Sequence, residues 1–280
     1  MDRARAAPCP ILTRMSRIIR NERSKQQKIS HLHRFFVRPE CVEGGRVRLD
    51  GLEARQICSV LRLGRGDQFA ALDGSGRALI VRISEAGPAS LLGEVLEARP
   101  MDTEPRVRVT LLQSLPKGDK LEFILQKGTE LGVARFEIVT TARTVARPPE
   151  DRLAPRLERW RAIAKEAAEQ SCRAIVPQVS GVPALAEFLP RLAEFDLALC
   201  LWEGEQRQGI GEILSRNRSA ENVLVMIGPE GGFEEDEVRM MQAGGAHAVS
   251  LGRRILRCET AAIAAAAIVV YEMDVEASLA

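Results

Sequence analysis

The sequence has no apolar segment long enough to cross a bilayer. A membrane-spanning helix needs about 20 consecutive apolar residues. The longest apolar run here is the short, Ala-rich stretch Ala261–Tyr271, and we interpret it as a buried helix. Residues 1–30 also lack the apolar core of a secretory signal peptide. No membrane association is expected.

Paired metal-ligand motifs are missing as well. The chain has 6 cysteines, but none stands in a C-x-x-C pair and none clusters with a histidine. Zinc sites and disulfide frameworks both need such spacing. Neither is expected, so no metal is assigned. A reducing cytoplasm is the compartment that this cysteine usage favours.

Most of the chain lacks the positive charge typical of a nucleic-acid-binding domain. Eight of the 40 Lys and Arg residues and two of the 38 Asp and Glu residues lie in residues 1–30, so this segment has a net charge of +6 and the rest has −4. Contacts with nucleic acid must therefore come from local patches or from the basic segment. We interpret residues 1–30 as a disordered basic extension or as the product of a start codon placed too far upstream. Their Arg-rich, acid-poor composition also resembles an organellar transit peptide.

Two patterns of secondary structure follow, on either side of a proline-containing linker expected at residues 100–105. Residues 31–99 contain short strand-like segments around one helical segment, 53–63, and this pattern predicts a small barrel. In residues 106–280 expected strands alternate with expected helices, which predicts a parallel, doubly wound α/β sheet. The expected strands are 34–37, 46–49, 67–72, 77–83, 91–96, 106–112, 136–140, 196–201, 223–227 and 246–251, and the later expected helices are 118–131, 155–170 and 259–273.

The most informative motif is Gly228–Phe233. An apolar strand runs directly into this glycine-containing loop, and an acidic helix start, Glu234–Val238, follows it. In open α/β sheets ligands bind beyond the carboxyl ends of the strands, and glycine permits close approach of the backbone to a bound group. The same residues also suit a plain tight turn between strand and helix, and both readings stay open on this motif alone.

The acidic residues after the loop indicate which ligand would suit it. Glu234, Glu235 and Asp236 complement the positive end of the helix dipole and would repel a phosphate. The loop also lacks the Lys-Ser/Thr ending of a P-loop and the G-x-G-x-x-G order of a dinucleotide site. A ligand without phosphates that carries positive charge fits better, and S-adenosylmethionine has this character.

A second segment, Leu251–Ala261, joins a short strand to the last helix and carries Arg253, Arg254 and Arg257. Arginines at a strand end are candidates for contacts with RNA phosphates. A solvated basic loop is the alternative for each of them taken singly.

A third segment, Gln113–Lys120, bends an expected strand into an expected helix and brings Lys117 and Lys120 to that end. Arg173 follows Gln170-Ser171 after the long helical segment. We expect these cations to reach the same cleft, although surface lysines and polar helix ends usually serve only solubility and capping.

In combination these segments resemble the bacterial 16S ribosomal RNA (uracil-N3)-methyltransferases, of the SPOUT or α/β-knot superfamily. The resemblance covers nearly everything after His31. The pairing of Gly-Pro-Glu-Gly-Gly-Phe with Leu-Gly-x-Arg-Ile-Leu-Arg-x-Glu-Thr-Ala is highly specific. The matching segments are, in order, His33–Val37, Gln113–Lys120, Glu130–Val133, Gln170–Ser171, Gly228–Phe233 and Leu251–Ala261.

The resemblance implies a fold and an activity. Residues 31–99 would form a PUA-like β-barrel that binds RNA, and residues 106–280 a knotted SPOUT methyltransferase domain that acts as a homodimer. The cofactor would be S-adenosyl-L-methionine. The substrate would be N3 of one uridine in the decoding region of small-subunit ribosomal RNA, in an assembled subunit.

The resemblance also assigns residues. We hypothesise that Arg257 stabilises negative charge on the uracil, and that Glu230 orients the cofactor or accepts the N3 proton. A purely structural role in the loops is the alternative for both. The expected cofactor contacts are Leu201, Glu203, Gly228, Pro229, Glu230, Gly231, Gly232, Leu251, Gly252, Ile255, Leu256 and Arg257. The expected RNA contacts are Arg34, Lys117, Lys120, Arg173 and Arg254.

Two departures from the family pattern stand out. Arg55-Gln56 occupies a place where many relatives have histidines, so an RNA contact of the first domain can differ. Gly128 replaces a more usual alanine and is expected to loosen its helix.

Two other classes of function stay open at this point. One is a non-catalytic RNA-binding factor with this fold, against which the intact glycine motif argues. The other is a small-molecule enzyme that uses a nucleotide, against which the acidic helix start and the missing P-loop argue.

Overall fold

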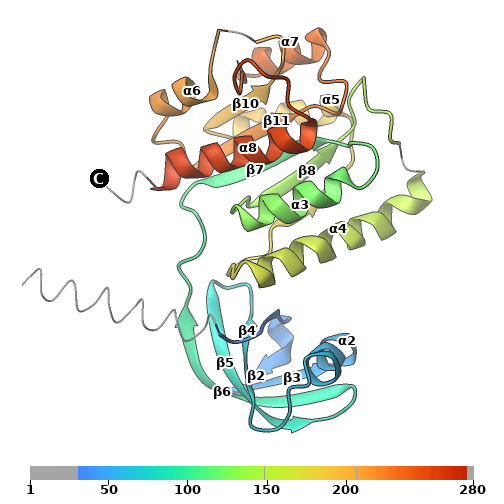
Figure 1. Cartoon of the computed structure of the whole chain (residues 1–280), viewed down its shortest axis with the longest axis vertical. Coiled ribbons are helices and arrows are strands. Elements are labelled where there is room, and N and C mark those ends of the chain that lie inside the picture. Colours follow the sequence, from blue (N-terminus) through green and yellow to red (C-terminus); the bar gives the residue numbers. More distant parts are fainter. Residues whose placement is uncertain (1–30, 148, 206, 276–280) are drawn as a thin grey trace, which may run out of the picture. The chain divides into compact units, whose positions relative to one another are not determined.

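The computed structural model describes residues 31–147, 149–205 and 207–275 (Figure 1). The expectations about residues 1–30 lie outside the described residues. The chain divides into two compact units between Pro100 and Met101, and each is described by itself. In the described part, no helix has the length and apolar character needed to cross a membrane. Within the same ranges, no three His, Cys, Asp or Glu side chains gather as metal ligands.

The first unit is a six-stranded sheet in the order β1-β4-β5-β6-β3-β2, built around one apolar core. Its neighbouring strands are antiparallel, except that β1 runs parallel to β4. Two irregularities in the β5–β6 ladder accompany the curvature of these long strands in Figure 1. The elements are β1 (Arg34–Phe36), η1 (Pro39–Cys41), β2 (Val42–Glu43), β3 (Arg46–Asp50), α2 (Gly51–Arg55), η2 (Gln56–Val60), β4 (Gln68–Leu72), β5 (Arg77–Ala86) and β6 (Ser90–Pro100).

The expected strands of this unit are confirmed, with ends that differ by a few residues. Where one helix is expected at residues 53–63, the chain forms a single α-helical turn, α2. It continues as the π-helical turn η2, which ends at Val60. Ala54 and Ile57 are the buried residues of these two turns, whereas Val60 is exposed. Each of the two turns therefore packs a single residue on the sheet. A longer helix would need a longer apolar stripe than this segment has.

The second unit contains six parallel strands in the order β12-β10-β11-β7-β8-β9. Leu111 and Val225 point into one core, which includes residues of α3 and α8, and Leu112 and Met226 point into another, which includes residues of α5 and α7. Helices therefore cover both faces, and the α/β class with a parallel sheet is confirmed. The elements are β7 (Arg108–Ser114), α3 (Lys120–Glu130), β8 (Arg135–Val139), α4 (Glu150–Gln170), β9 (Gln178–Ser180), α5 (Leu185–Phe188), η3 (Leu189–Glu194), β10 (Leu197–Leu201), α6 (Ile210–Arg216), β11 (Asn222–Ile227), α7 (Glu235–Ala243), β12 (His247–Val249), α8 (Cys258–Val270) and η4 (Tyr271–Val275).

Several short elements of this unit were not expected, namely β9, α5, η3 and α6. Each is too short to show the periodicity of a helix or a strand. The end of the expected linker also belongs to this unit, because Pro105 lies against Gly132, where a Cβ would come within 2.5 Å of its ring. Gly132 has a φ of +97° as well, so this tight junction requires glycine.

Gly128 does more than loosen α3. A Cβ at this position would lie 2.8 Å from the ring of Phe136, and both residues are buried. The glycine lets the aromatic ring of β8 pack directly on the helix, which offsets part of the conformational cost expected from the sequence.

Candidate functional site

Three loops that the sequence assigns to the cofactor leave neighbouring strands at the same edge of the second sheet. Leu201, the last residue of β10, pairs with Ile227 of β11 on one side and with Val249 of β12 on the other. Because these strands are parallel, the loops after them all start at the carboxyl edge. The structure therefore brings together the three predicted segments, which lie far apart in the chain.

The segment after β11, Gly228–Gly232, which we call the glycine loop, folds back on itself. The amide of Gly232 donates to the carbonyl of Pro229 at 2.9 Å. A Cβ on Gly228 would lie 2.9 Å from the carbonyl carbon of Gly232, and Gly232 has a φ of +70°. Both positions therefore require glycine, and the loop presents backbone rather than side chains.

The loop after β10 approaches the glycine loop. The carboxylate of Glu203 lies 3.6 Å from the place that a Cβ on Gly232 would take. Leu201 is half-buried and Glu203 is exposed. Two of the three loops thus lie side by side, with Glu203 close to the Gly232 backbone.

The third segment, Leu251–Arg257, which we call the arginine loop, turns sharply at Gly252, with a φ of +108°. Ile255 is 83% exposed, whereas Leu251 and Leu256 are half-buried. An apolar side chain so exposed beside glycine-rich backbone suits contact with a ligand or a partner.

Arg257 stands immediately before α8, and its carbonyl accepts the first hydrogen bond of the helix from Ala261 at 2.8 Å. Arg253, Arg254 and Arg257 are exposed. Their guanidinium groups form no hydrogen bond or ion pair with any of the described residues. The carboxyl edge therefore offers cations that the protein itself does not neutralise.

Glu230 is held by the beginning of α3. Its Oε1 accepts hydrogen bonds from the Lys120 ammonium at 2.6 Å and from the Lys117 amide at 3.0 Å. Partial burial raises the pKa of Glu230, but the bonds from Lys120 and from the backbone outweigh it, so the pKa lies below its ordinary value. A carboxylate of low pKa is a weak base. This disfavours Glu230 as the proton acceptor and favours its role in holding the loop.

Sequence reasoning missed Gln113 as a site residue, although it belongs to one of the matching segments. Its side chain is buried at the end of β7, and its amide nitrogen donates to the carbonyls of Ser114 at 2.8 Å and of Gly228 at 3.3 Å. The Gln113 side-chain oxygen and the Ser114 hydroxyl are buried without a hydrogen-bond partner. Such buried polar atoms need a partner, and a bound ligand or water at the carboxyl edge would supply one.

Two thiols lie beside the site, and both are buried. Burial, followed by the neighbouring Glu259, raises the pKa of Cys258 to about 11. Burial raises the pKa of Cys200 to about 12. Both sulfurs are protonated at neutral pH, which argues against a covalent cysteine intermediate.

The other expected RNA contacts are dispersed. Arg34 lies in β1 of the first unit. Lys117 and Arg254 are exposed at the carboxyl edge of the second sheet, whereas Lys120 is engaged by Glu230.

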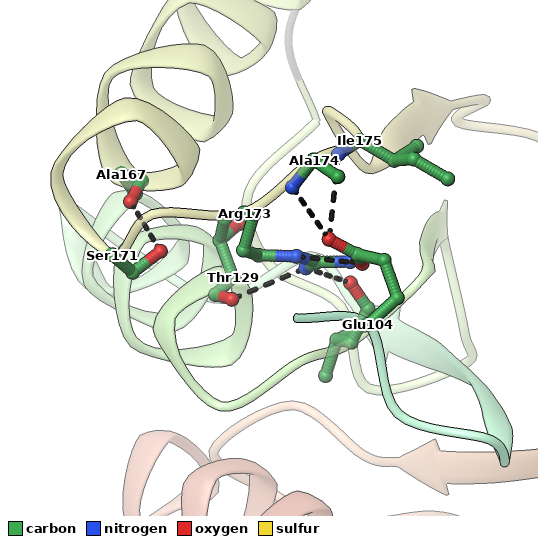
Figure 2. A network of polar contacts seen from close by, with 8 residues as sticks. Glu104, Thr129, Ala167, Ser171, Arg173, Ala174 and Ile175 are labelled. Atoms are coloured by element: carbon green, nitrogen blue, oxygen red, sulfur yellow. Dashed lines mark hydrogen bonds and ion pairs between the residues drawn. The ribbon is translucent and has the colours of Figure 1, made fainter. Parts of the chain in front are cut away.

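The expected RNA contact of Arg173 does not agree with the structure. Its side chain is buried, at 4% exposure, and it precedes β9 at the amino edge of the sheet. Figure 2 shows its guanidinium facing the Glu104 carboxylate and the Thr129 carbonyl. Another of its N–H groups donates to the carbonyl of Val133 at 2.6 Å. Its donors are used inside the protein, so the prediction that it binds RNA is wrong.

A pocket of about 440 Å³ also opens near the carboxyl edge. It lies over the ends of β8 and β9 and beside α7, and its lining includes Thr140, Leu185 and Glu237. None of the predicted cofactor residues lines it. The convergence of loops, and not this hollow, is the candidate site.

Comparison with known proteins relates this chain to RNA methyltransferases. A profile of the RNA methyltransferase domain matches residues 103–270. The ribosomal RNA small subunit methyltransferase E of Bacillus subtilis is 33% identical over 250 residues, which cover 87% of this chain and 98% of that protein. The Synechocystis protein of the same name is 35% identical over 232 residues, 82% of this chain and 74% of that protein.

A solved structure is similar over nearly the same length. The crystal structure of a ribosomal RNA small subunit methyltransferase E from Neisseria gonorrhoeae, bound to S-adenosyl methionine, has a TM-score of 0.76 and 33% identity to this chain. The match covers 85% of this chain and 96% of that one.

Proposed function

This chain belongs to the family of ribosomal RNA small subunit methyltransferases E, and from that premise we propose that it uses S-adenosylmethionine to methylate N3 of a uridine in the decoding region of 16S ribosomal RNA. The resemblance to the 16S ribosomal RNA methyltransferases is confirmed at the level of the family. The position of the modified atom is the part that the proposal adds.

One observation carries the proposal: the glycine loop follows β11 and lies beside the loop after β10, which is itself flanked by β12, and Gly228 has no space for a larger side chain. The residues fit a cofactor of this class. The first turn of α7 is acidic and is capped by Glu237, whose carboxylate accepts the amide of Glu234 at 2.9 Å. This end suits a cationic ligand and repels phosphates. The residues that would hold the cofactor are Leu201, Glu203, Gly228, Pro229, Glu230, Gly231, Gly232, Leu251, Gly252, Ile255, Leu256 and Arg257.

When bound, S-adenosylmethionine supplies an electrophilic methyl carbon on a sulfonium. The protein must then hold the uracil in line with this carbon while N3 loses its proton, and such positioning provides a large part of the rate. We assign to Arg257 the stabilisation of negative charge on the uracil, because its guanidinium has no partner within the described residues. We assign to Glu230 the orientation of the glycine loop.

RNA binding falls to both units. We propose that residues 31–99 form a PUA-like barrel with Arg34 at its RNA face, and that Lys117, Lys120 and Arg254 meet RNA at the carboxyl edge of the second sheet. N3 lies on the pairing edge of uracil, so the base must be unstacked or single-stranded when it reaches the site.

We also propose that residues 106–280 form a trefoil knot and a homodimer, and that the protein acts in the cytoplasm. The knot is supported by the path of the chain. After the edge strand β12, α8 returns to pack on α3, β7 and β11 in the middle of the sheet. This return is compatible with a knot, although the proposal of the knot itself rests on the family resemblance, since chains that thread their own loops are very rare.

The direct test is methyl transfer from radiolabelled S-adenosylmethionine to small ribosomal subunits that lack the modification, followed by nucleoside analysis. Label in 3-methyluridine is the expected result. Label in another nucleoside would contradict the assignment of N3. Absence of label in subunits, with cofactor binding measured separately, would refute the substrate but not the cofactor.

A further inference from the structure

The glycine loop is anchored from three sides, and the sequence pointed to only one of the anchors. Gln113 holds the Gly228 carbonyl from β7, and the beginning of α3 holds Glu230. The third anchor comes from the segment after β8, where Arg143 donates from Nη1 to the carbonyl of Gly231 at 2.7 Å. No motif had marked Arg143.

Arg143 contacts the loop through its alkyl chain as well as its charge. A Cβ on Gly231 would lie 3.3 Å from Cδ and 3.4 Å from Cβ of Arg143. The arginine stem therefore lies across the outer surface of the loop. Its Nε is also 3.7 Å from a carboxylate oxygen of Glu234, the residue at the N-cap position of α7.

The segment that carries Arg143 is rigid. Thr141–Thr144, which we call the threonine turn, is closed by a bond from the Thr144 amide to the Thr141 carbonyl at 3.1 Å. The Thr144 hydroxyl accepts the Thr141 amide at 2.8 Å, and the two hydroxyls are 2.9 Å apart. Both threonines are buried. These bonds fix the backbone of the turn, so Arg143 starts from a defined position, and only its side chain has to be ordered when it binds the Gly231 carbonyl.

A second bond ties the same turn to the first helix turn after the loop. The amide of Ala142 donates to Oε1 of Glu237 at 2.8 Å, while the other oxygen of that carboxylate caps α7. Glu237 is buried, so its two hydrogen bonds are shielded from most of the solvent. The threonine turn thus holds both the glycine loop, at Gly231, and the first turn of α7, at Glu237.

From these contacts we infer that Arg143 is a positioning residue, which keeps the glycine loop in the shape that binds S-adenosylmethionine. This inference rests on the proposed function, since it assumes that the loop is the cofactor site. Arg143 acts on the cofactor through the Gly231 carbonyl. Its loss allows the loop to move and reduces the fraction of protein that is ready to bind.

The test compares Arg143→Ala, Arg143→Lys and the control Arg147→Ala in the full chain. Arg147 is an exposed arginine on the same segment, outside the glycine loop contacts. S-adenosylmethionine alone is titrated by calorimetry, melting temperatures are recorded without ligand, and steady-state kinetics are measured with small subunits.

We expect Arg143→Ala to weaken cofactor binding about 3- to 10-fold, as for a charged hydrogen bond that is partly exposed. Arg143→Lys should recover part of this loss, and Arg147→Ala should bind as the native protein does. The KM for the cofactor should rise with Kd, while kcat at saturating cofactor stays within about twofold, the pattern of a lost binding interaction.

Three outcomes would overturn the inference, and they differ in what else they refute. If Arg143→Ala binds the cofactor as tightly as the native protein, the inference fails and the proposed function stands. If cofactor affinity is unchanged but kcat or RNA affinity falls, Arg143 contacts the substrate instead. If the native protein itself does not bind the cofactor, the proposed function and the inference both fail.

Discussion

Arg173 and Arg257, which lie at opposite edges of the α/β sheet, differ in whether the protein itself pairs their charge. At the amino edge, before β7, β8 and β9, the Arg173 guanidinium is enclosed by Glu104 and backbone carbonyls. At the carboxyl edge, Arg257 and its neighbours have no such partners within the described residues. A buried charge needs a partner within the protein, because burial without one is costly. An exposed charge without a protein partner is available to a ligand. Pairing, and not residue type, separates the structural arginine from the candidate functional ones.

The largest effect is expected at the amino edge. Replacing Arg173 by alanine leaves the Glu104 carboxylate without its cation, although the amides of Ala174 and Ile175 still donate to it. Breaking a buried ion pair costs about 3–5 kcal/mol, so the melting temperature should fall by about 6–20 °C for a unit of this size. Calorimetry or circular dichroism measures this change.

The control for Arg173→Ala is Arg254→Ala at the other edge. An exposed arginine without a protein partner should change stability by less than about 0.5 kcal/mol. If both variants melt at the same temperature, the contrast between the two edges is wrong.

The next largest effect is expected on catalysis. Arg257→Ala should lower turnover about 100-fold, as does the loss of one charge-stabilising donor in other active sites. The Kd for S-adenosylmethionine should change far less than turnover, because the charge acts mainly on the uracil. Single-turnover kinetics and cofactor titration separate the two effects.

Arg257→Lys should have intermediate turnover, because it keeps the charge but loses the planar fork of donors. Arg253→Ala serves as the control on the same loop. Turnover of Arg257→Ala equal to that of the native enzyme would remove Arg257 from the mechanism and leave the arginine loop with a structural role.

A third prediction asks whether the carboxyl edge depends on backbone shape. Gly228→Ala would place a methyl group 2.9 Å from backbone atoms of Gly232, which cannot move aside as a side chain can. We expect a loss of about 1–3 kcal/mol in stability together with a loss of cofactor binding at least as large as that of Arg143→Ala.

Gly211→Ala is the matched control for this glycine. Gly211 lies within α6, and a Cβ there would meet nothing within 4 Å. Alanine is favoured over glycine in a helix by up to about 1 kcal/mol, so this variant should be as stable as the native protein or more stable. Cofactor binding by Gly228→Ala at native affinity would show that the glycine loop does not form the site.

Much of the fold and the position of the loops could be predicted from the sequence. Strands such as β7 and β11 have clear patterns, and parallel strands necessarily bring their following loops to one edge. The glycine loop could therefore be recognised before the structure. Elements as short as β9 could not, because three residues do not show a period.

The pairings of charged residues could not be predicted. Arg173 and Glu104 are separated by 69 positions, and Glu230 and Lys120 by 110. Each pairing depends on the order of strands, which the sequence did not give in advance. For this reason the sequence grouped Arg173 with the RNA contacts and suggested Glu230 as a proton acceptor, and only the structure shows which partners they have.

The smallest effect concerns the ion pair of the carboxyl edge. The pKa of Glu230 in the folded protein lies below its ordinary value of 4.5. Its carboxylate therefore contributes stability above about pH 4.5, and this contribution is lost as the pH falls through the folded pKa. The side chains of Lys120 and Glu230 are 33% and 30% exposed, so solvent screening limits the contribution to less than about 1 kcal/mol.

Lys120→Gln should thus lower the free energy of unfolding slightly at pH 7, and the difference from the native protein should be smaller at pH 3, where a larger fraction of Glu230 is protonated. Urea unfolding at the two pH values measures it. Lys127→Gln is the control, since Lys127 pairs with Glu130 within α3 and not with the glycine loop. A difference for Lys120→Gln that persists unchanged at pH 3 would mean that Lys120 stabilises the edge by packing rather than by charge. The two edges would then differ in burial and not in the use of ion pairs.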